Sequence, residues 1–238
     1  MRRRAVLTLA ALLGARRASS HPEQTDARRM SHVVLLGDSV FDNGAYVQGG
    51  PDVVRQVRAV LPDGGRATLL AVDGAVLADV PRQLARLPED ATHLVVSAGG
   101  NDALRASGVL DRPAGSIAEA VAALAEVRNR FREAYRAMLD AVLARGRPAA
   151  ICTIYDPRYP DPARRSVAAA ALTLLNDVIT REAFARDLAL IDLRLLCDED
   201  ADFANPIEPS VRGGEKIAGA MAAMLREPRP GRRVFARP

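Results

Sequence analysis

Short runs of consecutive apolar residues alternate along the chain with longer segments whose apolar residues recur every three or four positions. Each short run has Val, Ile or Leu at successive positions, which is typical of a parallel strand covered on both faces. The runs therefore predict a buried parallel sheet. Its five predicted strands lie at residues 32–37, 67–72, 93–99, 149–155 and 188–193.

The segments between these runs have the period of amphipathic helices. The longest covers about residues 115–145, and Gly146 and Pro148 mark its end. Two more helices are predicted at about residues 162–186 and 210–225. Because strands and helices alternate, we expect an α/β fold with three layers, α/β/α, built on a doubly wound five-stranded parallel sheet.

Length and composition fit one such domain. A chain of 238 residues can bury a full core. No apolar run reaches the roughly 18 residues that a membrane-spanning helix needs, so we expect no membrane span. Cys152 and Cys197 lack the spacing of metal ligands, and we expect two buried free thiols. A disulfide between them stays open only if the protein is exported.

The net charge of +4 is distributed unevenly. Residues 1–29 carry seven Arg and two acidic residues, and residues 226–238 carry five Arg and one Glu, whereas the body between them has an excess of acidic residues. No basic stripe with interleaved aromatic residues crosses that body, which argues against nucleic-acid binding. We therefore expect a small-molecule partner, and a chain that acts as a monomer or a small homo-oligomer.

The two ends are predicted to lie outside the domain, which should cover residues 30–228. Residues 1–29 form an N-terminal extension with a basic start, a short apolar run and small residues at 18–20, as in a secretory signal peptide. Met30 directly precedes the first strand, so translation starting there is an open alternative, as is a retained tail. The protein would be exported or periplasmic in the first case and cytoplasmic in the second. Residues 229–238 are a basic C-terminal tail.

Polar residues that could carry chemistry follow the predicted strands. Asp38 and Ser39 follow the first strand in "GDS", Gly74 follows the second, and Asn101 and Asp102 follow the third in "GGND". Each short motif alone is an ordinary turn. In a doubly wound sheet, however, ligands bind beyond the carboxyl ends of the strands. The motifs together therefore predict a site at that edge.

This ordered set of motifs resembles the SGNH, or GDSL-type, hydrolases over about residues 32–225. The resemblance continues in "TIYDP", "LLND" and "IDLRLLC", while the Gly-x-Ser-x-Gly motif of α/β-hydrolases is absent. It implies the flavodoxin-like SGNH fold with Ser39 as the nucleophile. It also implies an oxyanion hole made by the backbone N–H groups of Ser39 and Gly74 and the side-chain amide of Asn101.

One block departs from the family pattern. The family has Asp-x-x-His-Pro before the last helix, and here the same block reads "NPIEP", with Asn205 and Glu208 in place of the Asp and the His. His21 lies in the N-terminal extension. His32 and His93 begin strands, roughly 23 Å from their carboxyl ends. Glu208 is thus the remaining candidate base. Its pKa stays open, because a helix N-terminus would lower it and burial or nearby carboxylates would raise it.

Three functions remain open at this point. The first is hydrolysis of a small acyl ester by Ser39, with Glu208 as the base and no metal or cofactor. The second is a catalytically degenerate SGNH fold that binds an acyl or sugar ester. The third is a hydrolase whose acidic cluster at the strand ends holds a hard cation. The catalytic candidates are Ser39, Gly74, Asn101 and Glu208, and the candidate binding residues are Asp38, Asp42, Tyr46, Asp102 and Tyr155.

Overall fold

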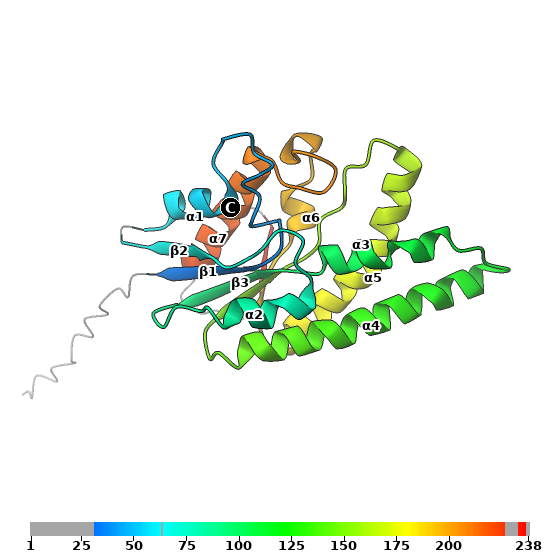
Figure 1. Ribbon diagram of the computed structural model, residues 1–238, viewed down its shortest axis with the longest axis horizontal. Coiled ribbons are helices and arrows are strands. Elements are labelled where there is room, and N and C mark those ends of the chain that lie inside the picture. Colours follow the sequence, from blue (N-terminus) through cyan, green and yellow to red (C-terminus); the bar gives the residue numbers. More distant parts are fainter. Residues whose placement is uncertain (1–30, 63, 227–232, 237–238) are drawn as a thin grey trace, which may run out of the picture.

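A parallel sheet forms the centre of the molecule (Figure 1). The computed structural model describes residues 31–62, 64–226 and 233–236, so the predictions for residues 1–29 and for most of the C-terminal tail lie outside the described residues. The strands follow the order β2-β1-β3-β4-β5-β6, and every neighbouring pair is parallel. Their bounds are β1 His32–Gly37, β2 Arg66–Leu69, β3 His93–Ser97, β4 Ala149–Cys152, β5 Ala189–Ile191 and β6 Val234–Phe235.

The expected doubly wound α/β/α fold is confirmed, and all five predicted strands are present. The sheet has six strands rather than five, because Val234–Phe235 pairs with β5 at the sheet edge. This strand is only two residues long and lies among basic residues and prolines, so no apolar run announces it. The stretch expected to be a tail thus contributes an edge strand.

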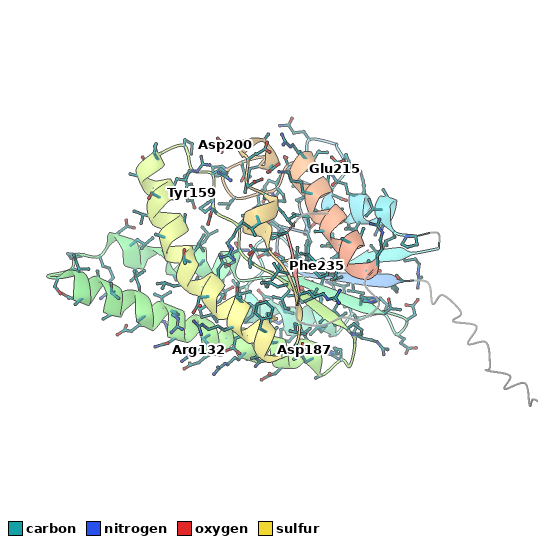
Figure 2. The ribbon with its side chains drawn as sticks, turned by 180° about the vertical axis from the view of Figure 1, so that it is seen from behind. Arg132, Tyr159, Asp187, Asp200, Glu215 and Phe235 are labelled. Atoms are coloured by element: carbon teal, nitrogen blue, oxygen red, sulfur yellow. The ribbon has the colours of Figure 1, made fainter. Side chains whose placement is uncertain are left out.

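Helices cover both faces of the sheet and explain its continuous apolar runs. In β1, Val34 and Leu36 pack on the core that contains α2, α4 and α5, whereas Val33 and Leu35 pack on the core that contains α1, α6 and α7. Figure 2 shows α4 and α7 on opposite sides of the molecule. The helices are α1 Val53–Val60, α2 Val80–Leu84, α3 Gly100–Ala106, α4 Ile117–Leu143, α5 Pro162–Ala185, α6 Leu193–Leu196 and α7 Val211–Arg226.

The three predicted helices correspond to α4, α5 and α7, with ends within about two residues of the expected positions. Their starts are capped: Ser116 Oγ accepts from Glu119 N at 3.1 Å, and Asp161 accepts from two backbone N–H groups at the start of α5. The pattern of apolar residues predicted none of α1, α2, α3 and α6. Each has eight residues or fewer, which is too short for a clear helical period.

Three helical segments lie at the carboxyl end of the sheet and contain no buried residue. They are residues 100–111 (α3 and the 3₁₀ helix that follows it), residues 117–130 of α4, and residues 162–174 of α5. We call them the helical arm. In Figure 1, α3 and the N-terminal half of α4 project together beyond the sheet. Within the described ranges, no helix combines the length and apolar character needed to cross a membrane.

Candidate active site

The turn after β1 holds Ser39 at the carboxyl edge of the sheet. Gly37 has φ +120°, and a Cβ there would lie 1.6 Å from the carbonyl oxygen of Ser97, so only glycine fits. Gln83 clamps this residue from α2, since its side chain bonds both Gly37 N and Gly37 O at 2.7 Å. Asp38 N donates to Ser97 O at 3.0 Å. The position of the Ser39 hydroxyl is thereby fixed by β3 and α2.

Ser39 and Glu208 meet although 169 residues separate them. Ser39 Oγ donates to Glu208 Oε1 at 3.0 Å, and the two residues are only 7% and 5% exposed. The second carboxylate oxygen, Oε2, is buried and has no hydrogen-bond partner among the residues that the structure describes. One oxygen of the carboxylate is therefore engaged with the hydroxyl, and the other is buried without a hydrogen bond to the described residues.

The loop before α7 presents Glu208 through its backbone. Asn205 Oδ1 accepts from the N–H groups of Ile207 at 2.9 Å and Glu208 at 3.0 Å, so its side chain shapes the turn. From the segment after β4, Tyr155 Oη donates to Ile207 O at 2.5 Å, and Arg158 N donates to Pro206 O at 2.7 Å. Asn205 thus holds the backbone of the loop, where the family aspartate would orient a base.

Burial controls the electrostatics of the site. It raises the pKa of Glu208 to about 7, against the hydrogen bond from Ser39 and with a smaller contribution from the charge of Asp73. Burial also raises the pKa of Asp38 to about 7; the hydrogen bond from Val40 N opposes this rise, and the charge of Glu208 adds to it. The direction that the sequence left open is therefore upward, because desolvation dominates over any effect of the α7 N-terminus.

The predicted oxyanion residues come together at the same edge. The backbone N–H groups of Ser39 and Gly74 donate to no acceptor in the described part of the chain. Gly74 has φ +77° with open space where a Cβ would stand. Asn101 Nδ2 donates to Ala75 O at 2.9 Å, which ties α3 to the Gly74 loop and leaves its second amide hydrogen. Ser39, Asn101 and Glu208 line one cleft, whereas Gly74 lines a separate hollow.

The predicted binding residues divide into two groups. Asp38 and Tyr155 line the cleft with Ser39. Asp42, Tyr46 and Asp102 instead support the loop that carries Gly74. Asp42 Oδ2 accepts from Asp73 N at 2.9 Å, Tyr46 Oη donates to Asp73 Oδ2 at 2.7 Å, and Asp102 Oδ2 accepts from Leu77 N at 3.0 Å.

Asp73 contacts the site residues but was not predicted from the sequence. It accepts from Tyr46, and its charge acts on Glu208. Its position directly before Gly74, after the second predicted strand, was a signal that could have identified it. Gln83 carried no such signal, because it lies inside a short helix far from any motif.

A sequence model of the GDSL-like lipase/acylhydrolase family matches residues 35–215, which is most of the chain. The chain belongs to this family. Solved structures with the same fold include an extracellular lipase from Streptomyces rimosus, which is 19% identical in sequence. The match covers 78% of this chain and 95% of the lipase chain, with a TM-score of 0.57. They also include phospholipase A1 from Streptomyces albidoflavus, 17% identical over 83% of this chain and 100% of its own, with a TM-score of 0.60.

The acetyl xylan esterase AlAXEase has the same fold, with 15% identity, a TM-score of 0.60, and coverage of 81% of this chain and 98% of its own. No curated protein matches the sequence. At such identities the solved structures establish the fold alone. The family is one of lipases and acylhydrolases, so at the family level the chain is grouped with ester hydrolases.

The two described histidines lie away from Ser39. His32 and His93 begin β1 and β3, at the opposite end of the sheet from the site, and burial lowers the pKa of both. His32 Nε2 lies 2.7 Å from Thr68 Oγ1, and His32 Nδ1 lies 2.9 Å from Asp90 Oδ1. His21 lies outside the described residues. Within the described ranges, the side chain hydrogen-bonded to Ser39 Oγ is therefore Glu208 and not a histidine.

The cleft beside Ser39 is apolar, with a volume of about 140 Å³. Its walls come from the helical arm, and its inner end is formed by Asp38, Ser39, Asn101 and Glu208. Cys152 and Cys197 are buried free thiols, as expected, and burial raises the pKa of both. Among the described residues, no group of three or more His, Cys, Asp or Glu side chains is arranged to hold a metal ion.

Proposed function

We propose that the protein is a serine ester hydrolase that cleaves a small acyl ester, with Ser39 as the nucleophile and Glu208 as the general base. One observation carries this proposal: the hydrogen bond of 3.0 Å from Ser39 Oγ to Glu208 Oε1 at the inner end of a cleft. A nucleophile and a base within hydrogen-bond reach are the arrangement that activates a hydroxyl.

The reaction would begin with attack of Ser39 Oγ on the ester carbonyl carbon, while its proton passes to Glu208 Oε1. The carbonyl oxygen becomes an oxyanion, which accepts hydrogen bonds from the N–H groups of Ser39 and Gly74 and from the amide of Asn101. Each such donor lowers the barrier by on the order of 3 kcal/mol, because it faces charge that appears only in the intermediate.

Collapse of the tetrahedral intermediate breaks the bond to the alcohol oxygen, and the protonated Glu208 supplies the proton that the leaving group needs. Water then attacks the acyl-serine, with the Glu208 carboxylate as the base, and releases the acid and the free Ser39 hydroxyl. The Oε2 atom is buried and makes no hydrogen bond to a described residue, so Oε1, which bonds Ser39 Oγ, is the oxygen that would carry the proton.

The pKa of Glu208 suits this role. An ordinary glutamate has a pKa of about 4.3 and is a weak base. With the pKa of Glu208 raised to about 7, a large fraction of the side chain is still ionised at neutral pH, and its affinity for the serine proton is higher. Burial thus gives the carboxylate a basicity close to that of imidazole.

The alternative is a family member that binds an ester without hydrolysing it. The contacts of Asn205 favour this alternative. Both of its hydrogen bonds go to the loop backbone, so no second side chain among the described residues orients the Glu208 carboxylate. Hydrolysis of p-nitrophenyl esters by the full chain decides between the two. Turnover that Ser39→Ala abolishes supports the hydrolase, and equal background rates for both proteins support the binding protein.

A further inference from the structure

The helical arm carries half of the exposed large apolar residues of the described chain. Ten large apolar residues of the described chain are exposed, and five of them lie on the arm: Leu104, Leu110, Ile117, Val121 and Val167. Single exposed apolar residues are ordinary, whereas a cluster of them marks a surface that binds something. The concentration on the arm therefore points to an apolar ligand at this end of the molecule.

The cleft connects this apolar surface to the reacting hydroxyl. Leu104 and Leu110 line it from one side, Leu124 from α4, and Ala171 and Leu172 from α5. None of these five side chains is fully buried, although all are apolar. A chain of methylene groups in the cleft would cover these side chains. The apolar side chains of the arm are therefore removed from water only when an apolar ligand is present.

Few polar side chains line the cleft, and two of them, Ser107 and Tyr155, already donate to backbone carbonyl groups. Ser107 Oγ donates to Leu104 O at 2.8 Å within its own helix. The Tyr159 ring is covered by the Arg164 guanidinium, which lies 4.3 Å from the ring centroid. A sugar placed along these walls would lose hydrogen bonds to water without replacing them, so the cleft discriminates against polar groups.

The length of the cleft indicates the kind of chain. Lining residues run along the arm from Asn101 to Leu110, which is about 14 Å at 1.5 Å per residue. An acetyl group attached to Ser39 would fill only the inner end. A medium-length acyl chain would reach the exposed leucines, and each methylene that it buries should strengthen binding about fourfold.

We propose that the substrates are esters of medium- or long-chain acyl groups, and that the helical arm is the site that selects them. This inference rests on the proposed function, because it takes Ser39 as the atom that receives the acyl group. The alcohol part of the ester would then leave on the side of Gly74, away from the arm.

The test compares p-nitrophenyl acetate with p-nitrophenyl decanoate, using the full chain and two matched variants of α5. Ala171 lines the cleft, whereas Ala170 is its exposed neighbour outside the cleft. We expect the wild type to hydrolyse the decanoate with a kcat/KM at least tenfold above that of the acetate. Ala171→Phe should lower the decanoate value at least tenfold and the acetate value less than twofold, whereas Ala170→Phe should change neither.

Other outcomes separate this inference from the proposed function. Ser39-dependent hydrolysis with a preference for acetate, or an equal loss on both esters in Ala171→Phe, overturns the chain-binding arm and leaves the serine hydrolase standing. Without turnover of either ester, calorimetry with sodium decanoate decides. Binding to the wild type and to Ala170→Phe but not to Ala171→Phe retains the acyl site, and no binding to any of them rejects it.

Discussion

Ser39 and Thr68 each bring a hydroxyl group against an acid or a base, and they lie at opposite ends of the same sheet. At the carboxyl end, Ser39 donates to the Glu208 carboxylate. At the amino end, Thr68, His32 and Asp90 lie in a row, with contacts of 2.7 Å and 2.9 Å on the two ring nitrogens of the histidine. By side-chain type alone, the second place looks more like a catalytic triad than the first.

The surroundings of the two places distinguish them. Ser39 lies in a turn whose N–H is unused and lines a cleft with Asn101. His32 lies in β1 and Thr68 in β2, where the backbones of the two strands pair with each other. Neither residue lines the cleft. An oxyanion needs free hydrogen-bond donors, and a substrate needs space. Free backbone N–H groups and a neighbouring cleft therefore mark the candidate active site better than the types of its side chains do.

The largest expected effect is the loss of the Ser39 hydroxyl. Because Ser39→Ala removes the atom that forms the acyl-enzyme, we expect kcat for p-nitrophenyl decanoate to fall by at least roughly a thousandfold. Thr68→Ala is the matched control at the other end of the sheet and should leave kcat within about twofold. Activity that survives in the first variant and disappears in the second would reverse the assignment of the two places.

Removal of the base should have the next largest effect. General-base catalysis contributes roughly a hundredfold or more, so Glu208→Gln should lower kcat/KM by about that factor. The wild-type kcat/KM should rise with pH through a midpoint near 7, the pKa of Glu208, because only the carboxylate accepts the proton. Glu208→His should recover little of the loss, since Asn205 bonds the backbone and cannot orient an imidazole. A flat pH profile would contradict the role of Glu208.

Ionisation of Glu208 should lower the free energy of unfolding. Its folded-state pKa is raised to about 7 from 4.5, so ionisation destabilises the folded state above pH 4.5, and the full cost of on the order of 3 kcal/mol is present above pH 7. Glu208→Gln should therefore increase the unfolding free energy at pH 8 and change it little at pH 4. Urea unfolding at both values measures this difference, and an equal change at both would show that burial of charge is not its cause.

The amino-end cluster should respond to pH in the opposite direction. The pKa of His32 is lowered by burial and then by the charge of Arg66, so its contribution to stability is lost as pH falls below 6.5. Thr68→Val removes the contact to the His32 ring and should cost about 1 kcal/mol without affecting esterase activity. Unfolding and kinetic assays on this variant complete the comparison, because a change in activity alone would contradict a structural role.

Much of the fold could be predicted from the sequence, because the burial of apolar side chains dominates the folding free energy and leaves a pattern in each short segment of the chain. Continuous apolar runs require a sheet covered on both faces, and Val33 to Leu36 do pack alternately on two cores. The short helices and the edge strand β6 were not predictable in this way. Their positions depend on packing between distant segments, as where α1 lies against α7, and too few residues carry a period.

By itself, the sequence placed His32 and His93 at the far end of the sheet, because their positions follow from strand geometry, and it left Glu208 as the candidate base. It could not determine whether that carboxylate would face Ser39, or whether its pKa would rise or fall. Those outcomes depend on desolvation and on a turn held by Asn205 and Tyr155, which are properties of the packed molecule. Tertiary structure alone decided that the glutamate is buried against the serine at the end of an apolar cleft.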